Sequence, residues 1–242
     1  MARLPRLVVA GLPHVVVHRG LNGQPVLLDE ADRATYLQAL SGAAREAGVL
    51  LHGYGLFSGE VRLLATPTTA TSLGQMMQAV GRRYVRAFNQ RHQRAGTPWE
   101  GRFRSTVLEP QAHFIEALRF VEGCDDDGTP LAGGSDALRW SSAGHHLGRR
   151  HEPALTEHEV FWALGNTPFE REAAYLALLA QPVPGAAREA VRDAALKGWA
   201  LGSPAFVDGL RAGTSRRPSP LRRGRPSRQS GTAEVAGRLS VP

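Results

Sequence analysis

Arginine side chains, which suit phosphate recognition, are concentrated in two short windows of this 242-residue chain. The window from 82 to 104 holds seven arginines and one acid, and the window from 211 to 228 holds seven arginines and no acid. The windows carry +6 and +7, although the net charge of the whole chain is only +7. This pattern favours a nucleic-acid partner, because neutralised phosphates release condensed counterions. The alternative is a solvated charged surface with a basic tail and no ligand.

The first window also contains aromatic residues, which can stack on bases. Trp99 and Phe103 lie among its arginines, as in proteins that combine base stacking with phosphate contact on single strands. Alternatively, Trp99 closes the edge of a sheet. The candidates for phosphate contact in this window are Arg82, Arg83, Arg86, Arg102 and Arg104.

In the second window, Arg223-Gly224-Arg225-Pro226 resembles the core of an AT-hook, whose arginines enter the minor groove of A·T-rich DNA. Such four-residue matches are common in arginine-rich tails, so we favour nonspecific phosphate attraction by Arg223 and Arg225 over minor-groove recognition. From about residue 212 the chain is rich in Arg, Pro, Ser and Gly, a composition that predicts disorder.

Histidines and acids near the middle of the chain raise the question of a metal site. The spacing of these residues matches no zinc pattern, so no metal site is predicted from them; they are His145, His146, His151, Glu152 and His158. The single cysteine, Cys124, excludes an internal disulfide, and with no recognisable signal peptide it favours a cytoplasmic protein. No apolar run approaches the roughly 20 residues of a membrane span.

The elements that must position these residues follow from hydrophobic periodicity. Strands are predicted at 13–18, 49–57, 60–66 and 103–108, the second and third joined by a tight Ser58-Gly59 turn. Helices are predicted after Asp29 as N-cap, from Ser72 with a capping box to Gln75, and from Pro110 to about Glu122.

The order β-α-β-β-α-β-α predicts an α+β, ferredoxin-like fold, an antiparallel sheet with helices on one face and the other face free for a ligand or partner. This domain should extend over 1–150, followed by a helical extension over 151–211 and a disordered tail over 212–242. The predicted core residues of the extension are Phe161, Trp162, Leu164, Tyr175, Leu176 and Leu178.

Five segments carry a pattern that resembles a known family. They are RGLNGQPVLLDEADRATYLQAL (19–40), HGYGLFSGEVRLLATP (52–67), SLGQMMQAVGRRYVRAFNQRH (72–92), WEGRFRS (99–105) and RWSSAGHHLG (139–148). In this order they are similar to the REP-associated tyrosine transposases, relatives of the HUH single-strand transposases. The later segments KGWALGSPAFVDGL (197–210) and RRGRP (222–226) extend the resemblance over most of residues 3 to 226.

The resemblance implies a strand with His-hydrophobic-His that grips a divalent cation such as magnesium, and a tyrosine on the following helix that attacks a DNA phosphodiester. Here Glu60 and Arg62 occupy the histidine positions. Glu60 could still offer one oxygen to a cation, whereas a guanidinium has no lone pair to give. We expect Arg62, oriented by Glu60, to contact a phosphate or to replace the cation structurally; a surface ion pair is the alternative.

The tyrosine position holds Phe120, which cannot form a phosphotyrosine. Helical periodicity places Phe120 off the buried stripe of its helix, on an exposed side. Tyr54 and Tyr84 could be proposed as substitute nucleophiles, but their positions favour burial, as do those of Tyr36 and Tyr175.

The sequence therefore predicts a DNA-binding member of this family, for single-stranded or hairpin DNA, with no catalytic residue intact, no cofactor and no strand-nicking activity. An active nicking enzyme with substitute residues, and a non-catalytic interaction protein or relic, are the alternatives. A homo-oligomer is compatible with the sequence, and no membrane association is predicted.

Overall fold

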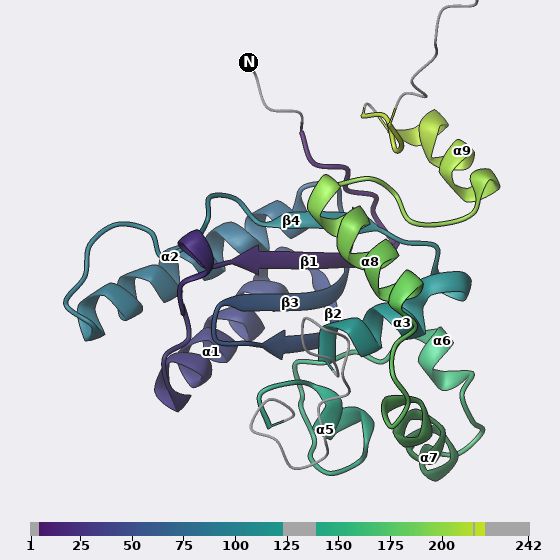
Figure 1. Ribbon diagram of the computed structural model, residues 1–242, viewed down its shortest axis with the longest axis horizontal. Coiled ribbons are helices and arrows are strands. Elements are labelled where there is room, and N and C mark those ends of the chain that lie inside the picture. Colours follow the sequence, from purple (N-terminus) through teal and green to yellow (C-terminus); the bar gives the residue numbers. More distant parts are fainter. Residues whose placement is uncertain (1–4, 123–138, 215, 221–242) are drawn as a thin grey trace, which may run out of the picture.

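The computed structural model describes residues 5–122, 139–214 and 216–220. Its elements follow the predicted order (Figure 1). They are β1 (His14–Arg19), α1 (Glu30–Ala47), β2 (Val49–Leu56), β3 (Glu60–Pro67), α2 (Ser72–Arg91), β4 (Arg104–Val107) and α3 (Pro110–Glu122), with a short 3-10 turn, η1 (Leu21–Gly23), after β1. Pro110 opens α3, where its missing N–H costs no helical hydrogen bond.

The four strands form one sheet in the order β2-β3-β1-β4, with all three pairings antiparallel. This arrangement confirms the ferredoxin-like fold. In the pairing of β1 with β3, Arg19 lies opposite Glu60 and Val17 opposite Arg62. The register therefore places Glu60 and Arg62 on one face of the sheet, beside Arg19, because side chains two residues apart point the same way.

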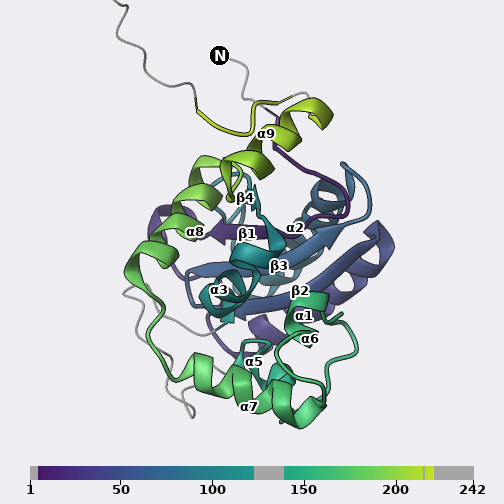
Figure 2. The ribbon, with the colours of Figure 1, turned by 90° about the vertical axis from the view of Figure 1, so that its right-hand side faces the viewer.

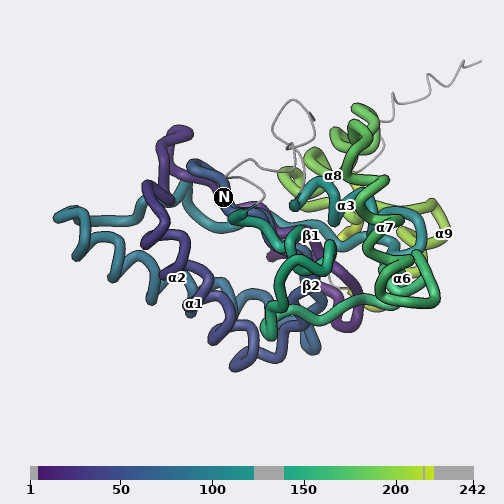
Figure 3. Tube along the Cα trace, turned by 90° about the horizontal axis from the view of Figure 1, so that it is seen from below, coloured from purple at the N-terminus to yellow at the C-terminus, as the bar shows by residue number. Residues whose placement is uncertain are grey.

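Helices α1 and α2 cover one face of the sheet and lie alongside each other (Figure 3). The Asp29 side chain caps α1 by accepting a hydrogen bond from the Asp32 N–H at 3.0 Å, as predicted. The capping box predicted for α2 is wrong: Thr71 is the N-cap residue, and the Ser72 hydroxyl instead bonds the preceding Thr68-Thr69 turn. That local turn competes for the hydroxyl that a box would need.

The opposite face, expected to be free, is covered by α3 and by α8 (Gly185–Lys197); Figure 2 shows the sheet between the two helical layers. Two glycines in β2 make the approach of α3 possible. A Cβ at Gly53 would lie 2.6 Å from Leu118, and one at Gly55 would lie 2.1 Å from the Val121 carbonyl oxygen. The expectation failed because α3 packs on this face through the two glycines and α8 folds back beside it.

The remaining elements are α5 (Ala143–His146), α6 (Glu159–Trp162), α7 (Pro168–Leu179) and α9 (Pro204–Gly213). Phe161 and Tyr175 are buried, as predicted. Trp162 and Leu176 are about half exposed, so their assignment to the core was wrong. Helices this short bury only one narrow stripe, and their other apolar side chains stay in solvent. No helix in the described ranges is long and apolar enough to cross a membrane.

Candidate nucleic-acid interface

The N-terminal end of β3, where Glu60 and Arg62 lie, contains a network of charged side chains. The Glu60 carboxylate lies between two guanidiniums: Arg19 Nε donates to Oε2 at 2.8 Å and Arg62 Nε donates to Oε1 at 2.6 Å. Both carboxylate oxygens are therefore engaged. Glu60 and Arg62 do not fit a divalent cation, because one is held by cations and the other cannot coordinate one.

Arg62 is packed inside the protein. Its side chain is 3% exposed, its Nη1 donates to the Phe120 carbonyl oxygen at 3.0 Å, and its guanidinium lies 4.4 Å from the ring centroids of both Phe57 and Phe120. These contacts combine cation–π attraction with charge-assisted hydrogen bonds. The burial of Arg62 contradicts the surface ion pair. The phosphate contact expected of Arg62 stays a prediction, because Arg62 also lines a pocket of about 480 Å³ together with Arg19 and Glu60.

Phe120 is 2% exposed, so its predicted exposure was wrong. The last six residues of α3, from 117 to 122, are all buried, because the sheet, the extension and Arg62 enclose that end of the helix on every side. Helical periodicity separates two sides of a helix only where one of them meets solvent.

The tyrosines considered as substitute nucleophiles serve packing, as predicted. Tyr54 and Tyr84 are almost fully buried, and burial raises the pKa of each phenol well above its usual value. Tyr54 donates to the Glu152 carboxylate and Tyr84 to the Val26 carbonyl. A buried phenol with a raised pKa is a poor nucleophile, since the phenolate is disfavoured.

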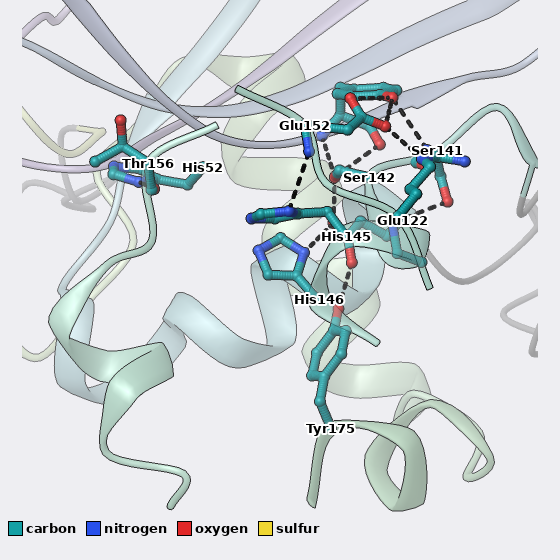
Figure 4. A network of polar contacts seen from close by, with 12 residues as sticks. His52, Glu122, Ser141, Ser142, His145, His146, Glu152, Thr156 and Tyr175 are labelled. Atoms are coloured by element: carbon teal, nitrogen blue, oxygen red, sulfur yellow. Dashed lines mark hydrogen bonds and ion pairs between the residues drawn. The ribbon is translucent and has the colours of Figure 1, made fainter. Parts of the chain in front are cut away.

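Several of the histidines and acids at the centre of the chain form a buried scaffold (Figure 4). Glu122, at the end of α3, accepts hydrogen bonds from His146 Nδ1 at 2.7 Å, from the Tyr175 hydroxyl at 2.7 Å and from the Ser142 hydroxyl. Burial lowers the pKa of His146, but the Glu122 carboxylate outweighs this effect and raises it above its usual value. The network joins α3, α5 and α7. Among the described residues, no three such side chains are grouped to hold a metal ion.

The arginines of the first window fall into two groups. Arg83 is paired with Glu46 at 2.7 Å, and Arg91 is paired with Asp29 and Asp32. Within the described part of the chain, no hydrogen bond or ion pair engages the side chains of the second group, which are exposed: Arg82, Arg86, Arg94, Arg102 and Arg104. Four of the five arginines predicted to contact phosphate therefore stay available, and Arg83 is held by an acid.

Three of these arginines surround one cavity. The cavity, here named the α2 pocket, has a volume of about 740 Å³ and is lined by α2 and by the segment that precedes β4. Arg82 and Arg86 project from α2 and Arg102 from the opposite segment, with Met77 and Phe103 among the apolar lining.

Trp99 also borders the α2 pocket, but its side chain is 3% exposed. Its ring stacks on His18 with centroids 4.0 Å apart, and its backbone forms an isolated bridge with Gly20 at the end of β1. Base stacking on Trp99 was therefore a wrong expectation, and closure of the sheet edge, the alternative, agrees with this bridge. The indole packs in the hydrophobic core between the sheet and helices α1 and α2, so its face is not available to a base.

A second cavity, the β4-edge groove, continues from the α2 pocket and shares Arg6, Arg102 and Phe103 with it. It has a volume of about 600 Å³ and lies between β4 and the end of α8. Its cationic lining residues are Arg6, Arg102, Arg104, Lys197 and Arg216, and its only acid is Glu100.

Like charges crowd at this edge. Burial, together with Arg102 and Arg104 nearby, lowers the pKa of Arg6 to about 10, so Arg6 remains protonated at neutral pH. Sequence reasoning missed Arg6, Lys197 and Arg216 as lining residues, because each is far from the first window along the chain and only folding brings them to β4. Of the three, Lys197 is paired with Asp193 at 2.5 Å. Lys197 does open one of the family-like segments, which was a usable signal.

Arg223 and Arg225 lie outside the described residues.

Comparison with known proteins gives matches among solved structures only. No protein-family model and no curated protein matches the chain. One matching structure is a REP-associated tyrosine transposase bound to a REP hairpin, with 11% identity and a TM-score of 0.46 over 66% of this chain and 93% of that one. Another is described as a transposase of Deinococcus radiodurans R1, with 24% identity and a TM-score of 0.34 over 48% of this chain and 93% of that one.

Proposed function

We propose that this protein binds DNA, in single-stranded or hairpin form, and does not cut it. The observation that carries the proposal is the continuous cationic surface formed by the α2 pocket and the β4-edge groove. Its arginines come from separate parts of the chain, and in the described residues Arg82, Arg86, Arg102 and Arg104 have no acidic partner. The order of the sequence segments that resemble the REP-associated tyrosine transposases supports DNA as the polyanion.

The absence of nicking follows from the side chains that replace the catalytic ones. Glu60 is held by two arginines, Arg62 fills the metal position with a fixed positive charge, and Phe120 has no nucleophilic oxygen. In this proposal Arg62 has taken over the structural part of the cation's role by joining β3 to α3, as its bond to the Phe120 carbonyl indicates.

Salt dependence tests the binding surface. If about six phosphates of a single strand are neutralised, the logarithm of affinity should fall against the logarithm of salt concentration with a slope near −4. Raising salt from 50 to 200 mM should then weaken binding about 300-fold. An affinity that hardly changes with salt would exclude this surface as the binding site.

A nicking assay tests the second half of the proposal. Wild-type protein incubated with hairpin oligonucleotides and Mg²⁺ or Mn²⁺ should give neither a cleaved strand nor a covalent protein–DNA adduct. A tyrosyl-linked oligonucleotide would instead support an active enzyme with substitute residues.

Replacing both Arg223 and Arg225 by Ala measures what the tail contributes to DNA affinity. Binding that depends wholly on these two residues would favour a non-catalytic relic with a basic tail.

A further inference from the structure

Two glycines in α2 are not required by the packing of the described chain. Gly74 and Gly81 lie within the helix, where glycine destabilises relative to alanine. A Cβ added at either position would meet nothing within 4 Å. They differ in this from Gly53 and Gly55 of β2, where a Cβ would collide with α3 or the residues around it. The packing of the described chain therefore leaves room for a side chain at both positions.

Both glycines line the α2 pocket, together with Gln78 and Val85. The spacing 74, 78, 81, 85 places these residues on one stripe of the helix, so the two glycines remove side chains from the helix face that forms one wall of the cavity. Glycine is the residue that lets a backbone be approached closely by a ligand. The volume of about 740 Å³ lies in the range of pockets for small ligands.

The residues that line the α2 pocket indicate the chemical class of its ligand. Met77, Val85 and Phe103 give it apolar walls, while Arg82 and Arg86 provide exposed guanidiniums on the same helix as the glycines. An apolar cavity bordered by guanidiniums suits a planar base joined to phosphates. A base within a duplex is stacked and cannot enter a pocket, whereas an unpaired base can.

We propose that the α2 pocket holds one unstacked nucleotide, with its base against the glycine face of α2 and its phosphates near Arg82, Arg86 and Arg102. This inference rests on the proposed function and specifies its ligand: an unpaired position of a strand, not a continuous duplex. The same chemistry would be offered by a free nucleoside monophosphate, so the test includes both.

The glycines provide a test in which stability and binding change in opposite directions. Gly74→Ala and Gly81→Ala should each raise Tm by about 1 to 4 °C, because alanine favours the helix, and should weaken binding of a short oligothymidylate. Gly209→Ala is the matched control: Gly209 is an exposed glycine inside α9, with nothing within 4 Å of a Cβ, and it does not line the pocket. It should raise Tm and leave binding unchanged.

A larger side chain and a modified strand sharpen the result. Placing one abasic site at successive positions of the oligothymidylate should reveal a position where wild-type affinity falls roughly 5- to 150-fold. Gly81→Leu, which fills the pocket, should bind the intact strand weakly and lose this dependence, whereas Gly209→Leu should behave as wild type.

The outcomes separate this inference from the proposed function. If the wild type binds the strand with the expected salt slope but Gly81→Leu binds equally well, or if no abasic position matters, the pocket inference is wrong and DNA binding stands. If the wild type binds no strand, the proposed function fails, and titration with thymidine monophosphate decides the pocket. Monophosphate binding that Gly81→Leu abolishes supports the pocket, and no binding overturns it.

Discussion

Arginines at two places in this molecule have opposite environments. On β3, Arg62 is buried between two phenylalanine rings and bonded to Glu60. At the β4 edge Arg102 and Arg104 are exposed, have no acidic partner among the described residues, and are close enough to Arg6 to lower its pKa. The difference teaches that local partners decide the role of an arginine: a satisfied, buried guanidinium stabilises the fold, whereas an exposed and crowded one is available for an anion.

The largest effect that tests this comparison is expected at Arg62. Arg62→Ala should lower the free energy of unfolding by about 3 to 5 kcal/mol, because it breaks a buried charged network and leaves a hole between β3 and α3. Urea unfolding followed by circular dichroism measures this. Arg83→Ala, which removes an exposed pair with Glu46, should cost less than about 1 kcal/mol.

Arg62→Met serves as the folded counterpart, since a hydrophobic side chain of similar length fills the space between the two rings. It should be more stable than Arg62→Ala and should keep wild-type affinity for DNA. A folded Arg62→Met protein with strongly reduced affinity would contradict the structural role and restore Arg62 as a phosphate ligand.

The next effect concerns the exposed arginines. Replacing Arg82, Arg86 and Arg102 together by Ala should remove three of about six phosphate contacts, so the salt slope should change from about −4 to about −2. Arg83→Ala, next to Arg82 in the chain but paired with Glu46, should leave the slope unchanged. Equal effects of Arg82→Ala and Arg83→Ala would show that only net charge matters, and the comparison would fail.

The smallest expected effect is a pH dependence of the free energy of unfolding that arises from His146, on the sheet face covered by α3 and α8. The folded-state pKa of His146 is raised by Glu122 despite its burial. Its contribution to stability is therefore complete below the unfolded pKa of about 6.5 and is lost as pH rises through the folded pKa. Urea unfolding across that range should show declining stability, and His146→Gln should flatten this part of the curve. An identical pH profile in the variant would exclude His146 as the source.

The sequence predicted the strands and helices of the sheet domain well, because the run of valines in β1 and the Asp29 cap of α1 are local signals. Sequence-based prediction of burial failed where a helix or strand packs against two other elements at once. The burial of Phe120 and the covering of the second sheet face both depend on α8 and on the rest of the extension, which are distant in sequence. At the site, helical periodicity correctly predicted that Arg82 and Arg86 are exposed. The ion pair between Arg83 and Glu46 could not be predicted in this way, because it forms only when α1 and α2 pack together.

The packing of α3 on β2 has a consequence for position 55 of the chain. The Val121 carbonyl lies where any side chain at position 55 would be, so the helix that carries Phe120 rests directly on the strand next to Arg62. A substitution at position 55 would therefore have to displace the end of α3, and with it the contact between Arg62 and Phe120. Position 55 is in this way restricted to glycine by a helix that lies far along the chain.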